Sequence, residues 1–352
     1  MVPEALRSIP EGSVDVTSPV TIDGLSYVDP TDPAMPMYRL LANLRSPVAL
    51  RDLMIRPVRT GYIGEGYTPP DPSMVPESGA EAEPDVDVSQ VYLPIDGGVA
   101  RCQLYRPRSV DAEEQLPVIV YLHGGGFTVG SSEDCDFLTR KLARTNRALV
   151  VSANYRMAPE FPFPTPFDDA MGVYRWVADH AALLGGGAGP VVVAGDSAGS
   201  NLAAAMPLRA RDEGVRVPDA VVLLGAMTDF RFERWPSFQA MAPRGIVYDS
   251  AFAGFLRGAY VPTTAWDHPW VSPIEGDLAD YPLTVIATGT HDPMIDSSKT
   301  FAQRVEGEGG RVVTYFPEGM PHGFYFFPKV HPEEDVAYTT VRGALASLLA
   351  TV

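Results

Sequence analysis

The sequence Val191-Val-Val-Ala-Gly-Asp-Ser-Ala-Gly-Ser-Asn-Leu202 decides the fold of this chain. Its apolar start, residues 191–194, predicts a buried strand, and the small residues that close it are compatible with a helix. A Gly-x-Ser-x-Gly segment between a strand and a helix is typical of a nucleophile elbow. Such a turn has no room for side chains at its glycines, so it would expose the Ser197 hydroxyl and set the Ala198 amide beside it at a helix N-terminus. The alternative is a glycine-rich turn that holds an incidental serine.

A second glycine-rich segment follows another apolar run upstream. Residues 118–122 predict a strand, which leads into His123-Gly-Gly-Gly-Phe127. Without side chains in the way, the amides of such a loop can turn inward and stabilise the oxyanion that forms when a carbonyl is attacked. The alternative is a flexible glycine loop without a catalytic role. A phosphate-binding loop is not supported, because the Gly-x-x-x-x-Gly-Lys-Ser/Thr pattern is absent.

An acid and a histidine follow the serine, each in a loop just past a predicted strand. Asp292 comes after the apolar residues 283–289, and His322 comes after residues 312–316. The carboxyl ends of parallel strands are where site residues of such sheets gather. The chain order Ser197, Asp292, His322 is that of the α/β-hydrolases, and it differs from the chymotrypsin and subtilisin orders.

Three neighbouring residues compete for these roles. Asp296 is an alternative acid, because loop boundaries are uncertain by a few residues in a sequence. His291 is a weaker alternative base, since adjacent residues leaving a strand should point in different directions. Asp196 is interpreted as a hydrogen-bonding partner for nearby loops. No group of His, Cys, Asp and Glu has the spacing of a zinc site, so no metal and no cofactor are expected.

The chain resembles the hormone-sensitive-lipase-like family of carboxylesterases, also called bacterial family IV, of the α/β-hydrolase superfamily. His-Gly-Gly-Gly together with Tyr-Arg-x-Ala-Pro-Glu is close to diagnostic of this family. The matching segments span residues 123–324, and the N-terminal third carries no useful resemblance. They are His123-Gly-Gly-Gly-Phe127, Tyr155-Arg-Met-Ala-Pro-Glu160, Gly195-Asp-Ser-Ala-Gly199 with Asn201-Leu202, Asp292-Pro-Met-Ile-Asp296 and His322-Gly-Phe324.

The resemblance implies a serine carboxylesterase that hydrolyses short- to medium-chain esters through an acyl-enzyme intermediate. Ser200 departs from the family, which usually has a glycine at this position, and adds a small polar group under the nucleophile. The family's roles transfer by position. They make Ser197 the nucleophile, His322 the general base and acid, Asp292 the residue that orients it, Gly125, Gly126 and Ala198 the oxyanion-hole donors, and His123 a structural support of the glycine loop.

The expected fold class is α/β: an α/β-hydrolase fold with a mostly parallel sheet of about eight strands, flanking helices and a helical cap. The sheet should start antiparallel, because two strands precede the βα units. Residues 1–56 are expected to be an N-terminal helical cap segment, 57–86 a Pro/Gly/acid-rich linker and 87–352 the catalytic domain, with a cap insertion at about 230–270. Strands are predicted near residues 88–95, 99–105, 117–122, 148–153, 190–194, 219–224, 283–288 and 311–315.

The amino-acid composition restricts the classes of molecule that the chain is expected to bind. The 352 residues carry a formal net charge of −17, which disfavours binding to nucleic acid or anionic membranes. No stretch is long and apolar enough to span a bilayer, and no signal peptide is visible, so a cytoplasmic location is expected. The expected partner is a small-molecule ester, and a homodimer is one of the oligomeric states left open.

Two other classes of function stay open. The same triad serves amidases, lactonases, deacetylases and acyltransferases, and sequence does not separate them. Some hydrolase-fold proteins are instead non-catalytic small-molecule receptors. Such receptors commonly lose a triad member, whereas all three are present here, so this reading is the less favoured one.

Overall fold

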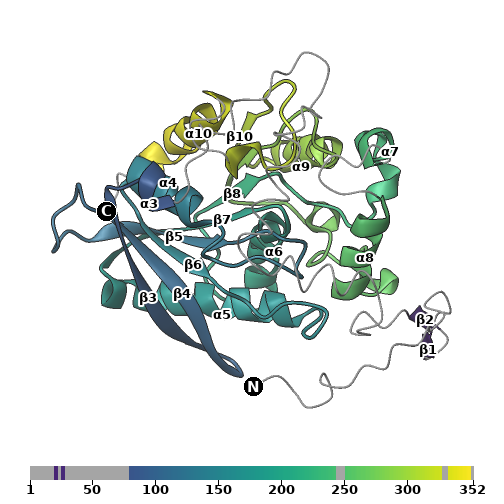
Figure 1. Ribbon diagram of the computed structural model, residues 1–352, viewed down its shortest axis with the longest axis horizontal. Coiled ribbons are helices and arrows are strands. Elements are labelled where there is room, and N and C mark those ends of the chain that lie inside the picture. Colours follow the sequence, from purple (N-terminus) through teal and green to yellow (C-terminus); the bar gives the residue numbers. More distant parts are fainter. Residues whose placement is uncertain (1–19, 23–24, 28–78, 243–249, 327–331, 350–352) are drawn as a thin grey trace.

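The computed structural model describes residues 20–22, 25–27, 79–242, 250–326 and 332–349. An eight-stranded sheet with the order β10-β9-β8-β7-β5-β6-β4-β3 forms its centre (Figure 1). β3 and β4 pair antiparallel, β4 also pairs antiparallel with β6, and the remaining pairs are parallel, which confirms the predicted sheet. Its strands are β3 (Val86–Ile95), β4 (Gly98–Pro107), β5 (Leu116–Leu122), β6 (Leu149–Ala153), β7 (Gly186–Asp196), β8 (Ala220–Leu224), β9 (Leu283–Ala287) and β10 (Val312–Tyr315).

Helices cover both faces of this sheet (Figure 1). α4 (Asp136–Asn146) and α10 (Pro332–Leu349) pack together on one face. α5 (Thr165–His180), α6 (Ala198–Asp212) and α9 (Ile295–Gly307) cover the other. The result is the three-layered arrangement expected of an α/β-hydrolase fold.

The central strands are apolar along their whole length because both of their faces are buried. In β5, Val118, Val120 and Leu122 belong to the core beside α5 and α6. The residues between them, Ile119 and Tyr121, belong to the core beside α4 and α10. Alternate side chains of a strand point to opposite faces, so a strand covered on both sides needs a continuous apolar run and not an alternating one.

The chain reverses its direction across the sheet between β5 and β7. From β5 it passes through α4 to the neighbouring β6, and from β6 it returns through α5 to β7 on the other side of β5. The two connecting helices therefore lie on opposite faces, and the loops that leave β5 and β7 diverge at this point. In open α/β sheets, ligands bind at the carboxyl ends of the strands where such a reversal occurs.

The insertion between β8 and β9 is helical where it is described. It contains α7 (Pro236–Met241), α8 (Ser250–Tyr260) and the short 3₁₀ helices Phe232–Arg234, Thr263–Ala265 and Pro273–Glu275. Two further 3₁₀ helices are Ala181–Leu184 and Phe324–Phe326. The predicted cap insertion at 230–270 falls in this segment, and its residues 243–249 lie outside the described ranges.

Most of the predicted N-terminal cap segment, residues 1–56, also lies outside the described residues, as does most of the predicted linker, 57–86. Within them the structure describes the antiparallel strands β1 (Val20–Ile22) and β2 (Leu25–Tyr27). The end of the linker contains α3 (Gly79–Ala82) and the first residue of β3.

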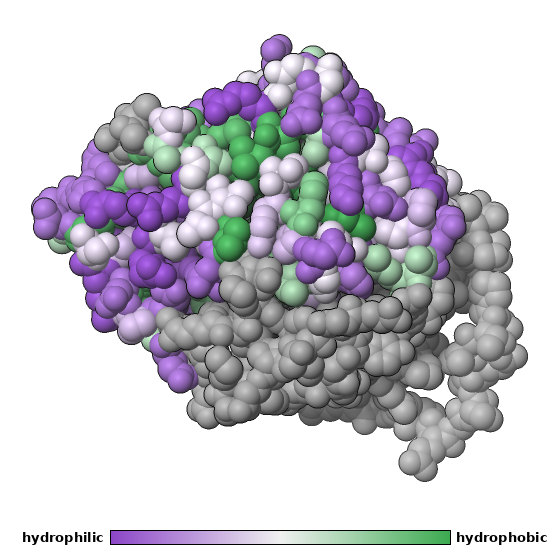
Figure 2. Space-filling model, turned by 90° about the horizontal axis from the view of Figure 1, so that it is seen from above, coloured by the Kyte–Doolittle hydropathy of each residue, from purple (hydrophilic) through white to green (hydrophobic). Residues whose placement is uncertain are grey.

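In the coloured part of the surface in Figure 2, hydrophilic residues surround smaller groups of hydrophobic ones. Within the described ranges, no helix has both the length and the apolar character that crossing a membrane requires.

Candidate active site

Ser197 lies in a strained turn between β7 and α6. Its backbone angles are φ 50° and ψ −116°, a conformation that residues with a side chain rarely adopt and that is common at functional sites. The flanking glycines make the turn possible. A Cβ on Gly199 would lie 2.0 Å from the carbonyl oxygen of Leu122, and one on Gly195 would lie 2.4 Å from the Gly199 backbone. The elbow is thus pressed against the end of β5, which brings Ser197 to the loop that follows this strand.

The structure brings Ser197, His322 and Asp292 together in one hydrogen-bonded row. Nε2 of His322 is 3.0 Å from Oγ of Ser197, and Nδ1 is 2.7 Å from Oδ2 of Asp292. Because a carboxylate only accepts hydrogen bonds, this contact assigns a proton to Nδ1 and leaves Nε2 of the neutral ring free to accept the serine proton. Asp292 is buried, and its Oδ1 accepts a hydrogen bond from the Met294 amide at 2.9 Å. The carboxylate is therefore fixed from both sides.

Two opposing effects set the pKa of His322. Burial of the ring lowers the pKa, while the charge of Asp292 and the hydrogen bond to it raise it, and the balance lies above the usual value for histidine. A base with a raised pKa is a stronger proton acceptor. Because the pKa is raised, Nε2 becomes protonated, and the ring stops acting as a base, at a higher pH than in an ordinary histidine.

The loop after β5 has backbone amides that no protein group in the described ranges uses. Gly125 and Gly126 have positive φ angles of 110° and 60°, and the carbonyl of Gly125 accepts the Val129 amide at 3.0 Å, which closes the loop. In the part of the chain that the structure describes, the amides of Gly125, Gly126 and Ala198 donate to no protein acceptor. Unpaired amides at the carboxyl ends of β5 and β7 suit an oxyanion, whose charge would supply the missing partner.

His123 packs inside this loop. Its ring stacks on Tyr155 with centroids 4.2 Å apart, and its Nδ1 lies 2.7 Å from the Gly124 carbonyl oxygen. Burial lowers the pKa of His123 to about 4, so the ring is neutral and its Nδ1 can carry the proton that binds this carbonyl. Tyr155 also donates its hydroxyl to the His123 carbonyl at 2.6 Å. The Tyr155 contact was not foreseen, although this residue opens the Tyr-Arg-Met-Ala-Pro-Glu motif.

The competing residues have other partners. Asp296, in the first turn of α9, accepts the Ser237 amide of α7 at 2.8 Å. His291 contacts Thr290, with Nδ1 3.4 Å from Oγ1. The hydrogen-bonded row that reaches Ser197 through His322 is formed with Asp292.

Ser200, which stands where the family usually has glycine, ties the elbow to the loop after β8. Its buried hydroxyl donates to the Ser197 carbonyl at 2.5 Å and accepts the Met227 amide at 3.0 Å. That loop passes directly beside the triad, because a Cβ on Gly225 would lie 3.0 Å from Cε1 of His322. The departure from the family therefore adds hydrogen bonds below the nucleophile and leaves the row of three intact.

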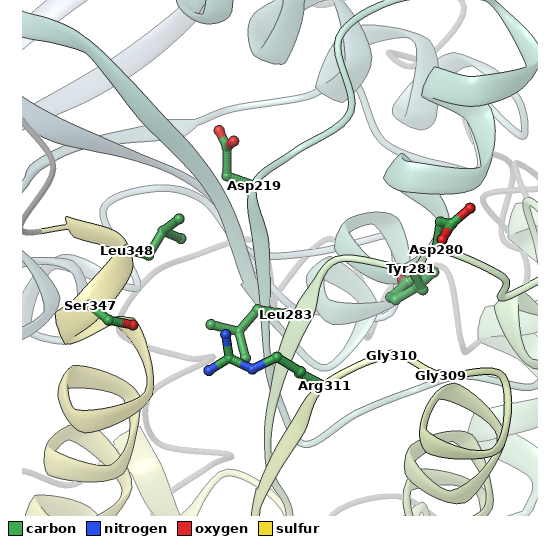
Figure 3. A pocket seen from close by; sticks show the side chains of 9 residues that line it. All are labelled: Asp219, Asp280, Tyr281, Leu283, Gly309, Gly310, Arg311, Ser347 and Leu348. Atoms are coloured by element: carbon green, nitrogen blue, oxygen red, sulfur yellow. The ribbon is translucent and has the colours of Figure 1, made fainter.

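A shallow hollow of about 570 Å³ lies elsewhere on the sheet (Figure 3). Its lining includes Asp219, Leu283 and Arg311, which stand at the amino ends of β8, β9 and β10, together with Ser347 and Leu348 of α10. Ser197 and its partners follow the carboxyl ends of their strands. The hollow therefore lies at the opposite ends of the strands and does not belong to this site.

The chain is similar in sequence and in fold to known esterases. Residues 119–326 match a family described as having the alpha/beta hydrolase fold. The carboxylesterase NlhH of Mycobacterium tuberculosis is 36% identical over 237 residues, 66% of this chain and 73% of that protein. A protein of Pseudomonas putida named ethyl acetate hydrolase is 31% identical over 76% of this chain and 85% of its own. A solved esterase of the archaeon Pyrobaculum calidifontis is 30% identical, covers 89% of this chain and 97% of its own, and superposes with a TM-score of 0.71.

Substitution of Gly126 tests the glycine loop. A Cβ there would meet Leu256 of α8 at 2.5 Å, in a backbone conformation that branched residues disfavour, so Gly126→Val should displace the amides beside Ser197. We expect turnover to fall by about 100- to 1,000-fold, the loss that removal of one oxyanion donor causes in a serine protease. Steady-state kinetics on a short-chain ester, with circular dichroism to verify folding, measures this. A folded variant with normal turnover would mean that the loop does not form the hole.

Proposed function

The chain belongs to the hormone-sensitive-lipase-like family of the α/β-hydrolase superfamily and is a carboxylic ester hydrolase, and we propose that it cleaves short- to medium-chain esters through Ser197, His322 and Asp292. One observation carries the proposal. The buried carboxylate, the imidazole and the serine hydroxyl form a continuous row, and unpaired amides lie on the loops that leave β5 and β7. This combination supplies a nucleophile, a base and electrostatic stabilisation in one place.

The reaction begins at the serine. As the Oγ of Ser197 bonds to the ester carbonyl carbon, its proton passes to Nε2 of His322, and the imidazolium is stabilised by Asp292. The carbonyl oxygen gains the negative charge and accepts hydrogen bonds from Gly125, Gly126 and Ala198. His322 then gives its proton to the departing alkoxide as the carbon–oxygen bond breaks, so the alcohol leaves and the acyl group stays on the serine.

Water completes the cycle by the same route. His322 takes a proton from a water molecule as the water oxygen attacks the acyl carbon. The bond to Oγ then breaks, the proton returns to Ser197, and the carboxylic acid is released. One ester and one water therefore give one alcohol and one acid, and no other co-reactant is needed.

The insertion between β8 and β9 supports a limited substrate size. Leu256 of α8 is only partly exposed and lies against Gly126, so an aliphatic side chain borders the place where the carbonyl oxygen would bind. A bulky acyl or alcohol group would have to displace it. The relative named ethyl acetate hydrolase is consistent with a preference for small esters.

A chain-length series tests the substrate class. We expect kcat/KM to be highest for p-nitrophenyl esters of short and medium fatty acids and to drop for palmitate, because the insertion borders the oxyanion loop. Matched p-nitroanilides should be cleaved far more slowly. Anilide cleavage at the rate of the esters would favour an amidase, and activity that rises to the longest chain would contradict the size limit.

Replacement of the serine tests the nucleophile. Ser197→Ala should lower ester hydrolysis by several orders of magnitude and keep the fold, because the oxyanion donors alone retain only a small part of the catalysis. An organophosphonate should label the native enzyme once, at Ser197, as read by mass spectrometry of peptides. Labelling of the same stoichiometry in Ser197→Ala would show that another residue is the nucleophile.

Acidification tests the base. His322 acts only when neutral, so kcat/KM should fall as the pH drops through its pKa, which the Asp292 charge holds above the usual value despite burial. Asp292→Asn removes this charge; the acid limb should then move to lower pH, and turnover should fall by up to about 10,000-fold, as in a serine protease. Asp296→Asn is the matched control, with near-normal kinetics expected. Collapse in Asp296→Asn with normal turnover in Asp292→Asn would move the acid to position 296.

A further inference from the structure

Asp196 is a buried carboxylate beside the nucleophile that the reaction described above does not use. It is the last residue of β7 and is 1% exposed. Its Oδ1 accepts the Tyr121 hydroxyl of β5 at 2.6 Å and the Gly124 amide of the glycine loop at 2.9 Å. Its Oδ2 lies so close to Gly124 that a Cβ on this residue would be 2.2 Å away. One carboxylate thus joins the end of β7 to the loop after β5, across the point where the strand order reverses.

No lysine or arginine in the described ranges forms an ion pair with this carboxylate. The groups near it are acids that burial keeps neutral, and the charge of Asp196 raises the pKa of each further. They are Tyr121 of β5, Cys135 before α4, Tyr155 after β6, and Tyr338 of α10, whose pKa the charge of Glu334 also raises. A buried negative charge without a cation is costly, so its retention beside the elbow calls for a reason.

His322 is the cation that the reaction itself provides. Burial raises the pKa of Asp196 to about 6, and the hydrogen bonds and the charge on His322 limit this rise. In return, Asp196 contributes to raising the pKa of His322, after the larger contribution of Asp292. Two buried carboxylates therefore raise the pKa of the His322 ring: Asp292, which the ring contacts, and Asp196, which ends the strand before the nucleophile.

We propose that Asp196 is a positioning residue that fixes the glycine loop through the Gly124 amide and stabilises, through its charge, the His322 imidazolium formed during attack. The inference rests on the proposed function. Both effects depend on the ionised carboxylate, since protonation removes the charge and leaves a weaker acceptor for the amide. Below a pH of about 6, the carboxyl itself takes up a proton, and the two effects are lost together.

Asp196→Asn removes the charge and keeps the shape and one acceptor oxygen. We expect kcat to fall roughly tenfold with little change in KM, the lower end of the loss seen when a partner that orients a reacting group is removed. The acid limb of kcat/KM should move to lower pH, because His322 loses a stabilising charge. A purely structural role would lower activity without moving this limb.

Tyr121→Phe is the matched variant, because it removes one hydrogen bond to the carboxylate and leaves the charge. The hydroxyl lowers the pKa of Asp196, so its loss should raise that pKa and let the carboxyl take up its proton at a higher pH. The loss of kcat that Asp196→Asn shows at every pH should therefore appear in Tyr121→Phe only as the pH falls, and at a higher pH than in the wild type. This variant also keeps the proposal testable if Asp196→Asn does not fold. An acid limb at the wild-type position in folded Asp196→Asn would overturn the electrostatic role. An unchanged kcat in Asp196→Asn, or a kcat of Tyr121→Phe that follows the wild type at every pH, would overturn the positioning role.

Ser197→Ala, assayed in the same series, separates this inference from the function on which it rests. If Ser197→Ala is inactive and Asp196→Asn behaves like the wild type, only the role of Asp196 fails. If Ser197→Ala remains active, the proposed mechanism fails first.

Discussion

The close approach of the elbow to the end of β5 is the constraint on which the site depends. Gly199 lies so near the Leu122 carbonyl that a methyl group there would overlap it, and a methyl group on Gly195 would overlap the backbone of Gly199. Only with both glycines can α6 begin directly above β5. This forces the strained backbone of Ser197 and puts the serine next to the amides of the loop that follows Leu122. The core on both faces of the sheet holds the two strands rigidly, so the strain at one residue is maintained by many buried contacts.

Charge in the site is arranged around one histidine. Asp292 binds the Nδ1 edge of His322 directly, and Asp196 acts on the ring from the end of β7. Both carboxylates are buried, and both are held by backbone amides, those of Met294 and Gly124. Such preorganised groups need not reorient when the imidazolium forms, which is the main advantage of an enzyme site over water.

Much of this arrangement could be predicted from the sequence, because it follows from local patterns. Apolar patterning indicated the eight strands, and the order Ser197, Asp292, His322 identified three side chains that the fold then brings within hydrogen-bonding distance. Their catalytic roles stay predictions until the variants are assayed. Contacts between segments distant in the sequence could not be predicted, because no local pattern indicates them. Examples are the hydrogen bonds of Asp196 and the contact of Leu256 with Gly126, which comes from an insertion more than a hundred residues later. The start of β7 at Gly186 was also not foreseen, since glycines ahead of the apolar run do not favour a strand.

A crystal structure of the enzyme inhibited by a short-chain organophosphonate tests the central claim most directly, because the phosphonyl oxygen occupies the position of the oxyanion. The account predicts a covalent bond from phosphorus to Oγ of Ser197, with one phosphonyl oxygen about 2.7–3.1 Å from the amides of Gly125, Gly126 and Ala198. Nε2 of His322 should stay within hydrogen-bonding distance of Oγ or the leaving oxygen. An adduct on another residue, or a phosphonyl oxygen turned away from the glycine loop, would contradict the account.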